Sequence, residues 1–330
     1  MGRPRSEKVE EIKAKLIARL RDGFFRAGDR FLSNRAVAQK FGISYQTAHR
    51  LVNELCAEKW LERRPASGTY IPGGKSRGEG AQFVFHPRAR RAESFGARLL
   101  AALRQRLERD RIPFRLSFLD PKRPSLLSGF FPVIWECPAA VRACAAAGRS
   151  ALLLNDRPPS GMQAVYIDSV STDDFSGGAC AAQLLQQKSG AKQGFAILSG
   201  PLDDERSNRR VAGFRSVVRA SVVPAGGWYV EDGYRSAGDA LRRGPRGIFC
   251  CNDRLAEAVI DYCKRRSIAC PPLVGFDDAP VAEKLNLTII AIPWDELAGA
   301  AAEVIKRRLN GDTATSSHQM FSPRPVIRGL

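Results

Sequence analysis

The spacing of hydrophobic residues changes near residue 80, and this change limits the folds open to the chain. Before it, apolar residues such as Val9, Ile12 and Leu16 recur every three or four positions, which is typical of amphipathic helices. After it, short apolar runs alternate with amphipathic stretches, which predicts βαβ units and a parallel sheet. The segment between the two parts is rich in glycine and charge, as in a flexible linker. We therefore expect a small domain over 1–72, a linker over 73–80 and an α/β domain over 81–330.

The net charge of the chain indicates a polyanionic partner. The chain has 330 residues, 44% of them hydrophobic, and a formal charge of +18, which favours nucleic acid or an anionic membrane surface. The charge is +8 over 1–80, +8 over 81–150 and +2 over 151–330. The longest apolar runs are far shorter than the roughly 20 residues of a membrane span, and the N-terminus has no apolar signal segment. We expect no membrane contact and a cytoplasmic protein.

The residues that usually hold metals or perform catalysis show no motif spacing. Eight cysteines lie mostly in apolar runs without zinc-type pairs, so we expect small, buried, reduced thiols. No phosphate-binding G-x-x-x-x-G-K-[ST] loop, G-x-S-x-G elbow or H-E-x-x-H motif occurs. The three histidines, His49, His86 and His318, have no aspartate or cysteine at motif spacing. We expect no metal, no cofactor and no catalytic residue.

Three helices and a hairpin are predicted in the first 72 residues. A helix over 8–22 is followed by Ser33, the expected N-cap of a second helix that ends at Gly42. Ser44 is the expected N-cap of a third helix over about 45–58. Two segments in which apolar and polar residues alternate lie on either side of a Pro-Ala-Ser-Gly turn, and together they predict a hairpin. Two short helices joined by a tight turn form a helix-turn-helix, whose second helix enters the DNA major groove, and the hairpin is its wing.

This region resembles the GntR-type winged helix. Its motifs occur in family order within residues 8–72, namely Ala27-Gly28-Asp29-Arg30, Leu32-Ser33-Asn34-Arg35, Phe41-Gly42-Ile43-Ser44 and Gly68-Thr69-Tyr70-Ile71. The resemblance implies binding to a double-stranded DNA operator through Arg35, Ser44, Tyr45, Gln46, Thr47, His49, Arg50, Arg64 and Gly68. Glutamine can read adenine and arginine can read guanine. Tyr45 and His49 stand where the family commonly has arginines, so the operator of typical members is not carried over.

Short apolar runs predict the strands of the second part. They lie at 82–85, 115–119, 151–154, 164–168, 194–198, 227–230, 247–251, 272–275 and 287–292. Between Arg123 and Arg149 the strand signal is interrupted by Pro132 and Pro138. Polar pairs follow three of the strands, namely Asn155-Asp156, Asn252-Asp253 and Asp277-Asp278. Because ligands bind outside the carboxyl ends of parallel strands, these pairs are candidate ligand residues.

The second part resembles the LacI-type effector domain, which is related to the type I periplasmic sugar-binding proteins. The motifs are Asp174-Phe175-Ser176-Gly177-Gly178, Arg210-Val211-Ala212-Gly213-Phe214, Ile248-Phe249-Cys250-Cys251-Asn252-Asp253, Val274-Gly275-Phe276-Asp277-Asp278, Leu287-Thr288 and Pro323-Arg324-Pro325-Val326-Ile327-Arg328. The resemblance implies an α/β fold class, with a winged helix-turn-helix followed by two doubly wound parallel-sheet lobes that face a cleft. Lobe one would comprise about 81–166 and 292–316, and lobe two 167–291 and 317–330.

The same resemblance implies the ligand residues Phe85, His86, Asn155, Arg210, Asn252 and Asp277. A guanidinium, amides and a carboxylate suit a polyhydroxylated ligand, whose hydroxyls both donate and accept hydrogen bonds. The identity of this ligand stays open.

Together the two resemblances predict a transcription regulator of the arabinose-repressor type. It would be a homodimeric repressor whose operator affinity depends on a small-molecule effector, a sugar, through linkage. The alternative is a winged helix fused to a sugar-modifying enzyme, which the missing catalytic motifs disfavour. A binding or transport protein is a further alternative, which the winged helix disfavours. Turnover of a sugar by the 81–330 fragment would favour the enzyme.

Overall fold

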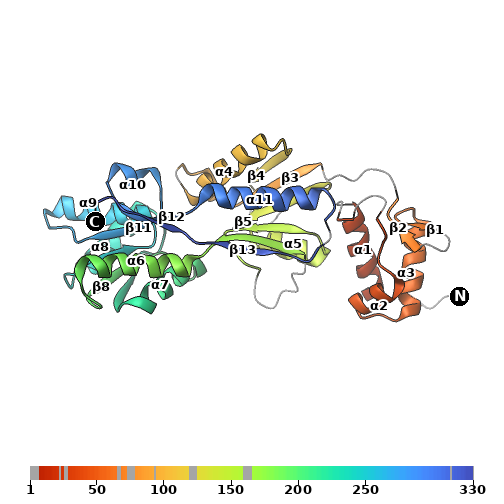
Figure 1. Cartoon of the computed structure of the whole chain (residues 1–330), viewed down its shortest axis with the longest axis horizontal. Helices are drawn as coiled ribbons and strands as arrows, with labels where there is room; N and C mark the ends of the chain where they lie inside the picture. Colours follow the sequence, from red (N-terminus) through yellow and green to blue (C-terminus); the bar gives the residue numbers. More distant parts are fainter. Residues whose placement is uncertain are drawn as a thin grey trace. The chain divides into compact units, whose positions relative to one another are not determined.

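The computed structural model describes residues 7–21, 24–25, 29–64, 68–72, 79–92, 94–118, 125–158, 166–312 and 314–329. Contacts divide the chain into two compact units, Met1–Ser171 with Ala298–Gln319 and Thr172–Leu297 with Met320–Leu330. The first unit holds the N-terminal helices and one six-stranded sheet, and the second unit holds another six-stranded sheet (Figure 1). The predicted linker lies mostly outside the described residues, and the predicted domain and lobe boundaries stay predictions.

The N-terminal elements are those predicted for a winged helix. They are α1 (Glu7–Arg21), α2 (Asn34–Phe41), α3 (Tyr45–Ala57), β1 (Glu62–Arg64) and β2 (Gly68–Tyr70). Ser33 Oγ accepts the Ala36 N–H, and Ser44 Oγ accepts the Thr47 N–H, so both predicted N-caps are confirmed. Gly42 ends α2 in the left-handed conformation, with φ 59°. β1 and β2 pair antiparallel.

One arginine, Arg19, links α1 to the part of the first unit that contains the first sheet. Arg19 is buried, and its Nε donates to the Gly148 carbonyl at 2.6 Å. Its guanidinium carbon lies 3.3 Å from the ring centroid of Tyr166, which Phe24 contacts edge-on. Burial lowers the pKa of Arg19 to about 10, and the neighbouring Tyr166 opposes this shift. The arginine stays charged at neutral pH and ties the first helix to the segment that enters the strand after Tyr166.

The first sheet has the order β13-β7-β6-β5-β3-β4. Its strands are β3 (Gly80–Phe85), β4 (Phe114–Phe118), β5 (Phe130–Trp135), β6 (Ala151–Leu154), β7 (Ile167–Thr172) and β13 (His318–Phe321). Strands β3 to β7 pair in parallel. The surrounding helices are η1 (Pro87–Arg90), α4 (Phe95–Arg109), α5 (Pro138–Ala147) and α11 (Trp294–Leu309).

Two sequence predictions for this sheet need correction. A strand, β5, runs straight through Pro132, where the prolines had weakened the prediction. Pro132 is in register with Gln82 on β3, and the pairing with β6 begins at Val133; Pro138 occupies the first turn of α5, where proline is favoured. The strand predicted at 164–168 is β7 instead, four residues further at its end. The strand is buried along its whole length, and its Asp168 is compensated by an ion pair with Arg308 at 2.8 Å.

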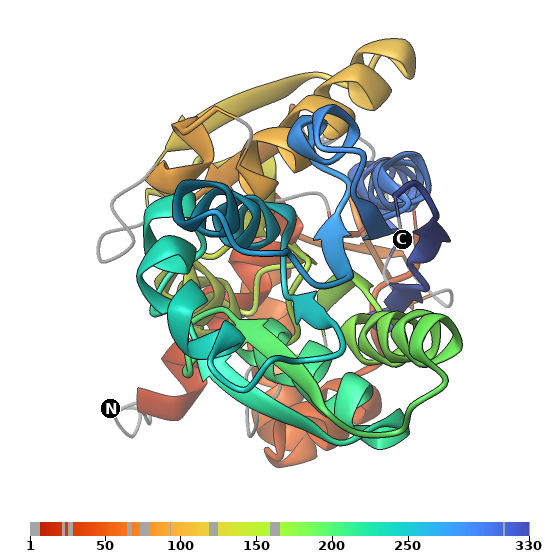
Figure 2. The same cartoon turned by 90° about the vertical axis from the view of Figure 1, so that its left-hand side faces the viewer.

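The second sheet has the order β14-β12-β11-β10-β8-β9. Its strands are β8 (Phe195–Ser199), β9 (Ala220–Pro224), β10 (Ile248–Cys250), β11 (Leu273–Asp277), β12 (Thr288–Ala291) and the antiparallel β14 (Arg324–Val326). Its helices are α6 (Asp174–Ser189), α7 (Glu205–Val217), α8 (Val230–Leu241), α9 (Asp253–Arg266) and α10 (Pro280–Lys284). The pairs α6–α7 and α8–α9 cover opposite faces of the sheet (Figures 1 and 2).

The strand predicted at 227–230 is wrong. The strand is β9, at Ala220–Pro224, and α8 begins at Val230. The Asp232 carboxylate accepts the Tyr229 N–H at 3.1 Å, so the aromatic run belongs to the start of a helix. The expectation of buried thiols holds for five of the cysteines, whereas Cys270 is exposed because it lies in the loop between α9 and β11.

Candidate functional site

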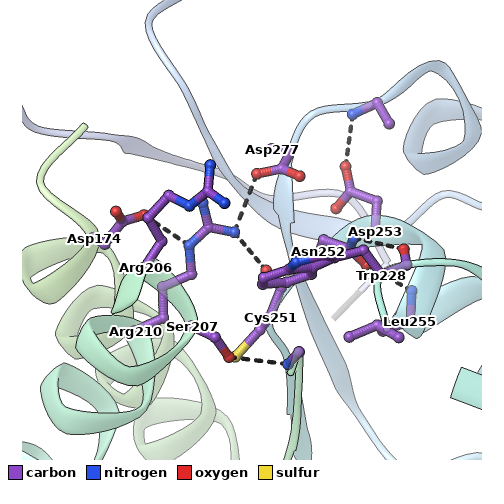
Figure 3. Close-up of polar contacts among 12 residues, drawn as sticks. Asp174, Arg206, Ser207, Arg210, Trp228, Cys251, Asn252, Asp253, Leu255 and Asp277 are labelled. Carbon is purple, nitrogen blue, oxygen red and sulfur yellow. Dashed lines mark hydrogen bonds and ion pairs between the residues drawn. The ribbon is translucent and has the colours of Figure 1, made fainter. Parts of the chain in front are cut away.

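A buried arginine organises the polar residues at the carboxyl ends of the second sheet (Figure 3). Arg210, on α7, is 3% exposed. Its Nε donates to Asp174 Oδ1 at 2.7 Å, and its Nη1 donates to the Cys251 carbonyl at 2.5 Å. The same Nη1 lies 3.2 Å from Asp277 Oδ1. One guanidinium therefore connects the first turn of α6, the residue after β10 and the last residue of β11.

The environment of Arg210 keeps it charged. Burial alone would lower its pKa, but the charges of Asp174 and Asp277 and the hydrogen bond to Asp174 raise it. The guanidinium carbon also lies 3.7 Å from the ring centroid of Phe276 and 5.9 Å from that of Trp228. The cluster has two carboxylates around one guanidinium, so it can accept hydrogen bonds from ligand hydroxyls.

Two glycines allow the close approach of α6 and α7 that this cluster requires. A Cβ atom on Gly178 would lie 2.0 Å from the Arg210 carbonyl oxygen, and one on Gly213 would lie 1.9 Å from the Phe175 carbonyl oxygen. Backbone atoms cannot yield as a flexible side chain does. Glycine at both positions brings Arg210 within reach of Asp174.

Asn252 has a structural role beside the cluster. Its Oδ1 caps α9 by accepting the Leu255 N–H at 2.8 Å, and its Nδ2 donates to the Trp228 carbonyl at 2.9 Å.

The backbone at Asp277 is in a conformation that L-residues rarely adopt, with φ 100°. The Trp294 Nε1 donates to the Asp277 carbonyl at 3.1 Å. Such strain persists where surrounding contacts hold it, and it is common at ligand sites.

Sequence reasoning missed several residues of this site. Asp174 is 2% exposed and forms the shortest ion pair with Arg210, while the preceding Asp173 caps α6. Asp204 caps α7, pairs with Arg206 at 2.7 Å and accepts the Trp228 Nε1–H at 3.3 Å. Two consecutive aspartates at the start of a helix are a sequence signal for this arrangement, in which one can cap the helix and the other can form an ion pair.

The pKa of the Asp204 carboxyl is strongly shifted. Burial alone would raise this pKa, but the Arg206 charge, hydrogen bonds from Arg206 and Ser207, and the Arg210 charge lower it to about 2. The carboxyl is therefore ionised throughout the physiological pH range and holds Trp228 in place.

The other three predicted ligand residues lie at strand ends of the first sheet. Phe85 ends β3, is fully buried and contacts Trp135, so it presents no surface to a ligand. His86 follows it, and its Nδ1 accepts the Arg88 N–H; burial and the Arg88 charge lower its pKa. Asn155 follows β6 in a left-handed conformation and is 4% exposed.

The predicted DNA-binding residues come from α2, from α3 with its N-cap, and from the hairpin of the winged helix. Tyr45, Gln46 and Arg50 are exposed on α3, with Thr47 and His49 half-exposed between them. The Tyr45 and His49 rings stack at 6.4 Å. Ser44 is the exposed N-cap of this helix, Arg35 is exposed on α2, and Arg64 belongs to β1.

Gly68, the first residue of β2, cannot be replaced by another residue without strain. Its φ is 125°, and a Cβ atom would lie 2.9 Å from Arg30 Nε. The tip of the wing therefore requires glycine.

The described residues offer neither a candidate metal site nor a membrane-spanning helix. Those residues contain no group of three or more His, Cys, Asp or Glu side chains that could hold a metal ion. No helix among them is both long and apolar enough to cross a membrane.

Comparison with known proteins identifies both parts of the chain. Residues 8–71 match the family of bacterial regulatory proteins called gntR, and residues 188–329 match a periplasmic binding protein-like domain. The HTH-type transcriptional repressor PurR of Vibrio parahaemolyticus is 25% identical over 147 residues, which are 40% of this chain. The match spans 44% of that relative, so less than half of its length is compared.

Solved structures show the same fold. A LacI transcriptional regulator from a Rhodococcus species has a TM-score of 0.64 at 22% identity, over 75% of this chain and 96% of that one. A LacI family regulator from Enterococcus faecium with bound ribose has a TM-score of 0.64 at 20% identity, over 75% and 97%. The CelR–cellobiose complex has a TM-score of 0.63 at 17% identity, over 99% of both chains.

The matched regions show a chain in which an N-terminal region similar to the gntR family of bacterial regulatory proteins precedes a periplasmic binding protein-like domain. The fold of this second domain is the one found in LacI-type transcriptional regulators of known structure. The predicted fold class and both predicted resemblances are confirmed.

Proposed function

We propose that this protein is a cytoplasmic transcription repressor whose affinity for a DNA operator is controlled by a small sugar. The observation that carries the sugar proposal is the cluster of Arg210, Asp174 and Asp277 at the carboxyl ends of β10 and β11. Asp277 keeps a 14% exposed side chain while its position is held by the buried guanidinium. A held carboxylate can accept hydrogen bonds from ligand hydroxyls, and the indole of Trp228, 5.9 Å from the same guanidinium, offers an apolar face to a sugar ring.

The same cluster argues against an enzyme. Both carboxylates are ion-paired with Arg210, so their oxygens are already engaged by the guanidinium and do not form an acid–base pair. Ribose and cellobiose are bound by two of the similar solved structures, and they support a sugar as the class of effector here. The similar protein PurR is a repressor, which supports repression rather than activation of transcription.

We infer that two copies of the chain act together on DNA. A winged helix inserts one recognition helix into the major groove, and a symmetric dimer reads two half-sites. A ligand that prefers one state of the sensing domain changes operator affinity by linkage, and DNA changes ligand affinity by the same factor. The candidate base-contacting residues are those on the exposed side of α3.

Two measurements on the full chain test this function. A thermal-shift screen with mono- and disaccharides should find a sugar that raises Tm, because a ligand at a hundredfold excess over Kd stabilises by about 2.7 kcal/mol. Fluorescence anisotropy with a selected operator duplex should then show an affinity that depends on that sugar. A sugar that is chemically converted by the protein would favour an enzyme, and an operator affinity unchanged by every stabilising sugar would contradict the regulator.

A further inference from the structure

The second sheet ends in a strand with one open edge. β9 is the last strand in the order, and among the described strands its one partner is β8. Beside it lies a groove of about 950 Å³, which is lined by all of β9, the start of β8 and the C-terminal end of α8. The groove lies within the second unit and away from Arg210, since none of the residues of the Arg210 cluster lines it.

The hydrogen-bond pattern shows which backbone groups face the groove side. The Ala225 N–H donates to Ser199, at the end of β8, so Ala225 directs its backbone groups toward that strand. Alternate residues of a strand direct their backbone groups to opposite sides. Ala220 and Val222 therefore direct N–H and C=O away from β8. At Pro224 the edge stops, because proline has no N–H and its carbonyl accepts the Ser236 hydroxyl.

The side chains around the groove are strongly basic. Four arginines line it, Arg219, Arg242, Arg243 and Arg246, against one acid, Asp239. Arg242 forms an ion pair with Asp239. Within the described residues no carboxylate forms an ion pair with the other three arginines, which are exposed.

This charge distribution decides between possible occupants of the edge. Two copies of the chain pairing through β9 about a twofold axis would place like charges opposite each other, which is unfavourable. A nucleic acid would neutralise the arginines but has no peptide groups to pair with Ala220 and Val222. An extended peptide with acidic side chains satisfies both the open strand edge and the arginines. It forms backbone hydrogen bonds with the edge and charge-assisted hydrogen bonds with the arginines.

We propose that this groove, the β9 groove, is a docking site for an acidic segment of a partner protein, which binds in extended conformation as an added strand beside β9. The backbone of Ala220 and Val222 sets the position of the segment, and Arg219, Arg243 and Arg246 select acidic side chains. Exposed strand edges are usually protected from further pairing by charged residues or proline. At β9 the exposed arginines carry one sign of charge, and a groove lies beside them. The site is independent of the proposed sugar and operator.

A synthetic peptide tests the proposal directly. The probe is a fluorescein-labelled peptide of alternating valine and glutamate, measured by anisotropy with the full chain in the absence of sugar and DNA. We expect saturable binding that weakens at least tenfold with Arg243→Ala plus Arg246→Ala. Arg235→Ala, on the exposed surface of α8 outside the groove, should leave the affinity unchanged.

Backbone pairing needs a test that does not depend on the fold of a variant. The same peptide with N-methylated valines keeps its charge and loses donors, so its affinity should fall at least tenfold. Val222→Pro should have the same effect on the unmodified peptide. The proposal is overturned if the valine–glutamate peptide does not bind, or if the N-methylated peptide or a valine–lysine peptide binds equally well. Displacement of the peptide by a random DNA duplex, or loss of binding on dimerisation of the chain, would assign the groove to nucleic acid or to a second copy.

Discussion

Arg210 and Asp277 are 67 residues apart in the chain, and Nη1 of the arginine lies 3.2 Å from Oδ1 of the aspartate. Asp174 holds the same guanidinium from the other side at 2.7 Å. Asp277→Asn should therefore leave the arginine paired and the domain folded, but remove the charged acceptor offered to the ligand. We expect the stabilising sugar to lose its effect on Tm. The neighbouring Asp278→Asn is the matched control, and an unchanged shift in Asp277→Asn would exclude this residue from the site.

Asp204 should make stability depend on pH in the acid range. Its folded pKa of about 2 lies below the unfolded value of 3.8, so its contribution of about 2 kcal/mol is complete above pH 4 and is lost as the pH falls toward 2. Asparagine can still cap the helix. Urea unfolding should show Asp204→Asn less stable by about 2 kcal/mol at pH 7, with the difference shrinking near pH 2. Asp203→Asn, at the exposed neighbouring position, serves as the matched control.

Gly178 limits the size of residue that α6 can carry. An added Cβ atom would meet the Arg210 carbonyl at 2.0 Å, so Gly178→Ala should separate α6 from α7 and lower the free energy of unfolding by about 3 kcal/mol. In Gly299→Ala the nearest atom is the end of the flexible Arg106 side chain, and helix propensity favours alanine by about 1 kcal/mol. Equal stability of the two variants in urea would contradict the close packing.

Arg50 should contribute to operator affinity with little effect on folding. Its side chain is 57% exposed, and its Nε is 3.9 Å from Glu54, a weak surface pair. Arg50→Ala should weaken binding to the selected operator by about tenfold or more, and binding to a random duplex much less. The exposed Arg266→Ala, on α9, serves as a control for net charge. Parallel losses on both duplexes would indicate phosphate contact rather than base recognition.

Arg19 and Tyr166 should stabilise the first unit jointly. Arg19→Ala removes a buried charged donor from Gly148 and the guanidinium from the Tyr166 ring, so we expect a loss of about 2 kcal/mol in urea unfolding. Tyr166→Leu should cost less. A double-mutant cycle should give a coupling energy of about 1 kcal/mol. Strict additivity would show that the two residues act separately.

Local features of the fold were predictable because local chemistry decides them. Ser33, Gly42 and Ser44 cap helices through atoms within four residues. In the two six-stranded sheets, β3, β4, β6, β8, β10, β11 and β12 coincide with the apolar runs that predicted them. Pro132 misled the prediction because a strand buried on both faces keeps its place in the sheet even with a proline near its start. The 227–230 segment misled the prediction because aromatic residues generally favour strands. Here they lie directly before and at the start of a helix.

By itself the sequence determined the two domain types, the helix caps, the basic N-terminal half and the strand ends where polar residues gather. Only the tertiary structure decided which of those residues act together. Arg210 meets Asp174, Cys251 and Asp277 across separations of 36, 41 and 67 residues, and the arginines of the β9 groove come from two segments. Such contacts depend on how whole elements pack, and the glycines that permit the packing show their reason only when the opposing backbone is in place.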